Sequence, residues 1–191
     1  MKGFRMRRCA GARVLLWCSV AGLPAASHAG TLHLVPATSH VQYHIDHSVK
    51  GVTNDAGPVS GLAETDSAGC LQSGVVEVDL RGLQTGIGMR DRHVKGEDCL
   101  DVAHFPTARF TLQPPPAPAA ADSLLANGTM ELHGQTHELQ VPLLVTREGP
   151  GLWLQGRFTF VLADWGIKRP KRFGLAAGKT VDVRLDLHFA P

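Results

Sequence analysis

Arg90, Asp91 and His93 are side chains that could do chemistry, and they lie close together in the middle of the chain. An Arg–Asp pair can fix a loop through a charged hydrogen bond, and a histidine can donate or accept a proton near neutral pH. One hypothesis is therefore an enzyme in which Asp91 and His93 act as acid and base. The alternatives are that the three side chains hold their own segment to the rest of the fold, which we favour, or that they contact the polar end of a ligand.

Sequence motifs of the common hydrolases and nucleotide-binding enzymes are absent from the chain. It contains no Gly-x-Ser-x-Gly, no His-Glu-x-x-His and no phosphate-binding loop. Catalysis would need a nucleophile, or an acid and a base held in one geometry. We therefore predict no catalytic residue, no enzyme activity and no cofactor.

Ten histidines raise the hypothesis of a metal site. His40 and His44 would share one face of a strand, and His133 and His137 lie on either side of a turn. Imidazoles on neighbouring strands can bind zinc or copper, but these spacings match no standard motif. We favour solvent-facing histidines and predict no metal ligand, with a histidine-based metal binder as the alternative.

Residues 1–29 have the pattern of an export signal. Basic residues come first, Val14 to Leu23 is apolar but too short to span a bilayer with ease, and Ser27-His28-Ala29 suits a signal peptidase. We predict a signal peptide cleaved near Ala29 and a periplasmic product, residues 30–191, that forms one domain.

The charge of that domain limits its partners, and its cysteines raise the question of a disulfide. Residues 30–191 keep 14 of the 19 basic and all 17 acidic residues, a net charge of −3, which argues against nucleic-acid binding. Cys70 and Cys99 remain in it. In an oxidising compartment they could form a disulfide, and the alternative is two separate thiols, one buried as a small apolar group.

Alternating apolar and polar residues predict about eight strands and no long helix. The clearest run is Val181 to Phe189, and His40 to Asp46 alternates in the same way. His133-Gly134-Gln135 marks a tight hairpin, and residues 164–178 are predicted to be a long loop. Evenly spaced antiparallel strands predict an all-β fold, a sandwich or a barrel, whose interior is either filled or holds one small ligand.

The segment from Leu83 to Phe110 interrupts this pattern and carries a recognisable series of motifs. Thr85-Gly86, Arg90-Asp91-Arg92-His93-Val94-Lys95, Asp98-Cys99-Leu100-Asp101-Val102 and Phe105-Pro106 occur in this order. The series resembles the signature of the YceI-like family of polyisoprenoid-binding proteins. Ser39 to His47, Gly128 to Pro142 and Asp164-Trp165-Gly166-Ile167 are similar to further parts of the family pattern.

The resemblance implies an eight-stranded antiparallel lipocalin-like barrel with a short helical or irregular insertion near residues 88–104. It also implies a periplasmic carrier for a long-chain isoprenoid or other lipid, such as a quinone or polyprenyl phosphate, held in an apolar tunnel without catalysis. Burial of each CH₂ group in such a tunnel is worth about 0.8 kcal/mol. The predicted ligand-binding residues are Val41, Tyr43, Ile45, Val78, Arg90, His93, Phe110, Leu143, Val145, Phe158, Phe160 and Trp165.

Three further hypotheses concern partners and activity. The basic run Lys168-Arg169-Pro170-Lys171-Arg172 could touch an anionic membrane transiently or receive a pyrophosphate, although a solvated loop is the interpretation we favour. The alternative enzyme would modify a lipid through Asp91 and His93. The sequence leaves the oligomeric state open, with a homodimer as one option.

Overall fold

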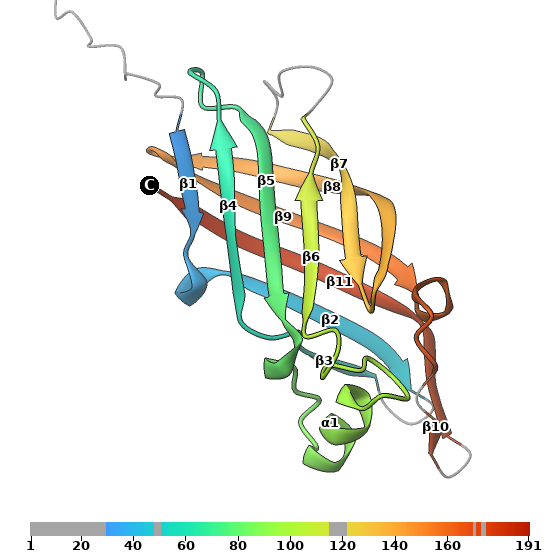
Figure 1. The fold of residues 1–191 in the computed structure, drawn as a ribbon. Helices are drawn as coiled ribbons and strands as arrows, with labels where there is room; N and C mark the ends of the chain where they lie inside the picture. Colours follow the sequence, from blue (N-terminus) through green and yellow to red (C-terminus); the bar gives the residue numbers. More distant parts are fainter. Residues whose placement is uncertain (1–29, 48–50, 115–121, 170, 173–174) are drawn as a thin grey trace, which may run out of the picture.

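The structure is a computed structural model that describes residues 30–47, 51–114, 122–169, 171–172 and 175–191 (Figure 1). The predicted signal peptide, residues 1–29, lies outside the described residues, as does most of the proline-rich run that follows Leu112. None of the described helices is long and apolar enough to cross a membrane.

A closed antiparallel barrel of eight strands forms the body of the molecule. Its order is β1-β4-β5-β6-β7-β8-β9-β11, and β1 pairs with β11 to close the ring. The predicted barrel is therefore confirmed. The strands of the structure, which include β2, β3 and β10 outside the ring, are β1 (Gly30–Leu34), β2 (His40–His47), β3 (Val52–Asp55), β4 (Val59–Thr65), β5 (Leu71–Asp79), β6 (Thr107–Leu112), β7 (Ser123–Leu132), β8 (Gln135–Glu148), β9 (Gly151–Val161), β10 (Lys171–Arg172) and β11 (Leu175–Ala190).

Strands β2 and β3 lengthen the barrel wall at one end. β2 lies beside β11 on the same edge as β1, and β3 pairs with β2. The 3₁₀ helix η1 (Pro36–Thr38) separates β1 from β2, and Ala56 to Pro58 separates β3 from β4. Gly57 has a φ of 145° there, and a Cβ on it would lie 2.1 Å from the Asp79 carbonyl oxygen, so only glycine fits this break.

The alternation of each strand directs its apolar residues into the barrel. In β11 the side chains of Val181, Val183, Leu187 and Phe189 are buried, whereas Asp182 and its alternate neighbours face outward. The same faces of the other strands complete one continuous apolar core.

The insertion between β5 and β6 covers one end of the barrel, as predicted for residues 88–104 (Figure 1). It contains η2 (Leu80–Gly82) and the two-turn helix α1 (Gly88–Lys95). The Leu100 and Val102 backbone N–H groups donate to the carbonyl oxygens of Val94 and Lys95, both at 3.0 Å, and these bonds fold the chain back after the helix.

One predicted segment was wrong. The predicted loop at 164–178 contains η3 (Leu162–Trp165), β10 and the start of β11, whose pairing overrides the charge of the local sequence.

The predicted hairpin at His133-Gly134 is confirmed, and it offers a test of how the insertion packs. Leu132 pairs with Gln135, and both turn residues have positive φ values of 52° and 70°, as a type I′ turn requires. A Cβ on Gly134 would also lie 2.7 Å from the Phe105 ring.

We expect Gly134→Ala to destabilise the protein more than Gly149→Ala. Both glycines have positive φ, which costs an alanine about 1–2 kcal/mol, but nothing lies within 4 Å of a Cβ on Gly149. Urea unfolding of both variants measures the difference. Equal losses would show that Phe105 moves aside at no cost.

Candidate functional site

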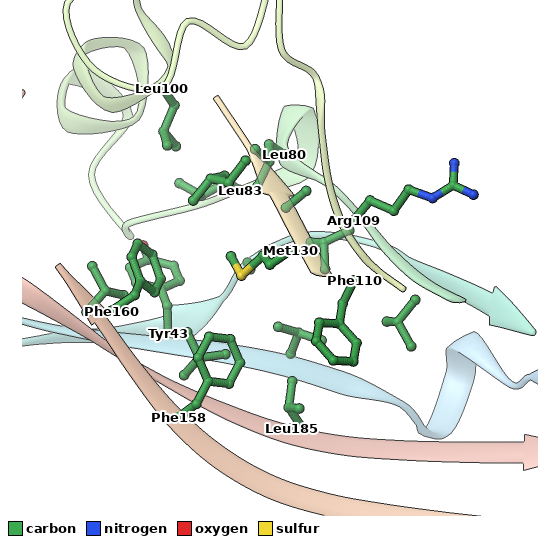
Figure 2. Close-up of a pocket in the computed structure, with 18 of the residues that line it drawn as sticks. Tyr43, Leu80, Leu83, Leu100, Arg109, Phe110, Met130, Phe158, Phe160 and Leu185 are labelled. Atoms are coloured by element: carbon green, nitrogen blue, oxygen red, sulfur yellow. The ribbon is translucent and has the colours of Figure 1, made fainter. Parts of the chain in front are cut away.

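A cavity of about 500 Å³ lies inside the barrel and reaches the insertion at its end (Figure 2). Its wall is almost entirely apolar and is formed by the inward side chains of the strands, by η2 and by α1. The cavity remains open because inward positions hold small residues as well as large ones, among them Ala63, Gly74 and Ala108.

Ten of the twelve predicted ligand-binding residues line this cavity. They are Val41, Tyr43, Ile45, Val78, Arg90, His93, Phe110, Leu143, Phe158 and Phe160. Their place in the wall follows from strand alternation and from the insertion motif. That they touch a ligand stays a prediction.

Trp165 and Val145 do not belong to the cavity wall. The Trp165 side chain is 3% exposed, and its ring packs edge-on against His137 of β8, at a centroid distance of 4.5 Å, and Phe160 of β9, at 6.0 Å. Val145 packs against the core instead.

Trp165 fills a wedge between β8 and β9. The ladder between these strands runs from the Leu143–Gly156 pair to the Glu148–Gly151 pair, so the first half of β8 and the last residues of β9 diverge beyond it. His133 Nδ1 lies 3.0 Å from the Trp165 carbonyl oxygen and holds η3 in place. This segment therefore closes the barrel with side chains where backbone pairing stops.

Sequence reasoning included Arg90 and His93 of the insertion but left its leucines out of the predicted site. Leu80, Leu83 and Leu100 line the cavity together with Met130 of β7, and Figure 2 labels all four. Their apolar character was visible in the sequence, but a segment without periodicity does not reveal which of its residues turn inward.

Three phenylalanines form the broadest apolar surface of the wall. The rings of Phe158 and Phe160 lie 6.4 Å apart on β9, and Phe110 faces the cavity from β6 (Figure 2). Phe110 packs over Gly128, where a Cβ would lie 2.5 Å from the ring. Gly128 is therefore the residue that lets this ring lie flat on β7.

The cavity wall contains one basic residue whose charge lies outside. The guanidinium of Arg109 points away from the cavity in Figure 2 and forms an ion pair with Glu77 at 3.2 Å. Only its aliphatic stem contributes to the site.

Polar groups gather at the end of the cavity that the insertion covers. The Tyr43 hydroxyl donates to the Gln84 carbonyl oxygen at 2.8 Å, and burial raises the pKa of Tyr43 above its ordinary value. Tyr43 is therefore a neutral hydrogen-bond donor at physiological pH.

Arg90 and Asp91 both bind Thr85. The Thr85 backbone N–H donates to Asp91 Oδ1 at 2.7 Å, the Thr85 hydroxyl donates to the same oxygen, and Arg90 Nη2 donates to the Thr85 carbonyl. Hydrogen bonds from Thr85 hold the pKa of Asp91 below its usual range. These bonds join residues of the insertion to one another, so the favoured hypothesis, that Arg90, Asp91 and His93 hold their segment to the rest of the fold, stays a prediction.

Arg90 retains an unused donor beside the cavity. Its Nε is buried and has no hydrogen-bond partner among the described residues. A buried donor of this kind is costly unless an acceptor satisfies it.

Asp91 and His93 have different surroundings. Residues two apart on a helix face different directions, and the Asp91 carboxylate is engaged by Thr85 whereas His93 lines the cavity. Within the described part of the chain, no hydrogen bond joins the two side chains.

Cys70 and Cys99 are both free and buried, so the disulfide hypothesis is wrong and the alternative of two thiols holds. Cys70 precedes β5 and Cys99 lies in the insertion beyond its far end (Figure 1). The nine residues of β5 separate them by roughly 30 Å, far beyond the Cα separation of a disulfide. Burial raises the pKa of the Cys99 thiol, which donates to the Lys168 carbonyl at 3.6 Å.

Three of the histidines behind the metal hypothesis contact other protein groups. His40 lies 3.6 Å from Asp55, His44 Nδ1 lies 2.6 Å from the Thr53 hydroxyl, and His137 packs on Trp165. Over the described ranges, no group of three His, Cys, Asp or Glu side chains could hold a metal ion.

The basic run at 168–172 is only partly described. Lys168 pairs with Asp98 at 3.3 Å and Arg169 donates to the Ala177 carbonyl, while the side chains of 170–172 are not among those that the structure describes.

Comparison with known families agrees with this architecture. The family model described as YceI-like domain matches residues 32–189, nearly all of the barrel and its insertion. The chain belongs to the YceI-like family.

Curated relatives match part of this YceI-like domain. UPF0312 proteins of Pseudomonas savastanoi pv. phaseolicola and Shewanella oneidensis are 33% and 30% identical to it over 103 and 99 residues. The matches cover 50% and 49% of this chain, and 52% and 51% of those proteins. The chain thus spans about half the length of the curated relatives it matches.

Solved structures share the YceI-like fold. BcnA of Burkholderia cenocepacia superposes with a TM-score of 0.71 at 19% identity, over 81% of this chain and 98% of that one. A polyisoprenoid binding domain from Saccharophagus degradans superposes with a TM-score of 0.67 at 19% identity, over 86% of this chain and 100% of that one.

We expect Asp91→Asn to remove part of the acid sensitivity of the YceI-like domain. A carboxylate with a lowered pKa in the folded state stabilises the fold above its unfolded pKa of about 3.9, and this contribution is lost as pH falls through the lower folded value. Melting temperatures between pH 7 and pH 2 should fall less steeply for Asp91→Asn than for wild type. The exposed Asp122→Asn serves as control, and parallel curves for all three proteins would contradict the prediction.

Proposed function

We propose that this YceI-like domain is a periplasmic carrier that holds a long-chain isoprenoid-type lipid, such as a quinone or polyprenyl phosphate. The observation that carries the proposal is the apolar cavity of about 500 Å³, which has polar groups at one end only. This volume lies within the range of about 300–1,000 Å³ that small-molecule sites occupy.

An apolar wall selects a chain rather than a polar metabolite. Each CH₂ group that leaves water for the cavity contributes about 0.8 kcal/mol, so a prenyl chain gains affinity with few polar contacts. The aromatic faces of Phe110, Phe158 and Phe160 offer broad contact for the flat, branched isoprene units.

The polar end of the cavity sets the orientation of the cargo. Tyr43, Arg90 and His93 all line the cavity, and the Nε of Arg90 has an unused hydrogen. A phosphate or quinone oxygen placed beside it would accept this bond. In this arrangement the head group lies under the insertion and the chain runs up the barrel.

Two further observations support the proposal. The solved structure from Saccharophagus degradans is described as a polyisoprenoid binding domain and has the same fold. The export pattern of residues 1–29 predicts a periplasmic location, where a lipid would have to be shielded from water.

Binding without catalysis fits the separation of Asp91 and His93. A carrier with His93→Ala should still retain cargo, whereas an enzyme that uses this imidazole would stop turning over. Incubation of both proteins with a prenyl lipid, followed by mass spectrometry of the lipid, distinguishes the two.

The direct test is mass spectrometry of an organic extract from natively purified protein. We expect an isoprenoid in about stoichiometric amount, because a buried chain leaves the cavity slowly. An extract without lipid, together with no binding of added prenyl lipids, would refute the proposal.

Filling the cavity should displace the cargo. Ala108 lines the cavity from β6, and its neighbour Thr107 is exposed. We expect Ala108→Phe to weaken prenyl-lipid binding by about tenfold or more, since the ring occupies space that several CH₂ groups would use. Thr107→Phe is the matched control on the same strand, and similar affinities for the two variants would place the ligand elsewhere.

Removing the guanidinium should affect head groups selectively. We expect Arg90→Met to weaken binding of a prenyl phosphate more than binding of the prenyl hydrocarbon that lacks a head group. A role of Arg90 in the fold alone would reduce both affinities by the same factor. Fluorescence titration with the two ligands measures the ratio.

A further inference from the structure

Two large apolar side chains are exposed at the start of α1, beside the cavity. Ile87 is 56% exposed and Met89 is 54% exposed, and both also line the cavity. We call residues 85–89 the mouth tip. The mouth tip therefore presents apolar surface to the outside at the point where the cavity reaches the surface.

The mouth tip is held in this position by hydrogen bonds. Thr85 binds Asp91 and Arg90, as described above, and the backbone N–H groups of Arg90 and Asp91 donate to the Ile87 carbonyl at 2.8 Å and 3.0 Å. Gly86 has a φ of 80° and makes the turn. The exposure of Ile87 and Met89 is thus fixed by the fold, although burial would be more favourable for each side chain.

The charges around the mouth tip favour a lipid surface. Residues 83–89 contain no charged side chain, and the nearest carboxylate, Asp91, is engaged by Thr85. Arg92 is exposed one helical turn after Met89 and shares its face of α1. An uncharged apolar pair with an arginine beside it suits contact with a bilayer surface that contains anionic lipids.

We propose that the mouth tip inserts Ile87 and Met89 into the surface of a lipid bilayer, so that the cavity opens onto the membrane. The inference rests on the proposed function, because a prenyl chain would otherwise cross water at a cost of about 0.8 kcal/mol for each CH₂ group. A docked mouth lets the chain leave the membrane and enter the barrel while it stays in apolar surroundings.

Vesicle flotation of natively purified protein tests the proposal. The vesicles contain phosphatidylcholine and phosphatidylglycerol, and the variant is Ile87→Ser with Met89→Ser. The matched control is Leu125→Ser with Leu144→Ser on β7 and β8, where the side chains are 52% and 49% exposed. Circular dichroism melting confirms that each variant is folded.

We expect wild type and the Leu125/Leu144 control to float, and the mouth-tip variant to bind vesicles about tenfold or more weakly, as the loss of two inserted side chains requires. Wild-type binding should also survive 0.5 M salt, because the contact is mainly apolar. Equal flotation of the two variants, no flotation of wild type, or its loss in salt would overturn the proposal.

Flotation needs no cargo, so it separates this inference from the proposed function. A protein that floats through the mouth tip and yields no isoprenoid would keep the docking surface and refute the carrier. A protein that contains isoprenoid and does not float would keep the carrier and refute the docking surface.

Discussion

Backbone pairing between β1 and β11 closes the barrel, and the cavity depends on that closure. His33 pairs with Ala190 and Leu34 with Phe189, which joins the two ends of the described chain. In a closed ring, ladder hydrogen bonds satisfy the backbone groups of the wall without help from the interior. The strands are therefore held together without a completely filled interior, and small residues can occupy inward positions.

The insertion brings charged side chains next to this apolar wall. Three of its charged side chains bond to backbone groups of the same segment: Arg90 and Lys95 donate to the carbonyls of Thr85 and Arg81, and Asp91 accepts from the Thr85 N–H. Such bonds keep charges close to an apolar cavity without leaving them unpaired. One end of the barrel can then recognise a polar group while the rest stays apolar.

Much of the fold was predictable from the sequence because strand alternation and turn chemistry are local. Val181 to Phe189 and the His133-Gly134 turn were clear for this reason. The family motifs then indicated the barrel and the placement of the insertion. Cavity residues on strands, such as Val41 and Phe158, followed from the same alternation.

Features that depend on packing between distant segments were not predictable. Trp165 was expected in the cavity wall, but the divergence of β8 and β9 draws it into the wedge instead. The separation of Cys70 from Cys99 depends on which end of β5 each one occupies. Leu83 and Leu100 line the cavity because the insertion folds back over the barrel end.

At the wedge filled by Trp165, the barrel wall is held together by a different kind of interaction from the rest of the wall. Elsewhere the ladder must break its hydrogen bonds before two strands can part, whereas at the wedge β8 and β9 are held by the packing of His137, Trp165 and Phe160. Side-chain packing can yield locally at a lower free energy than unfolding of the whole domain. Separating the first half of β8 from the end of β9 would therefore break side-chain contacts and no ladder hydrogen bond between these two strands.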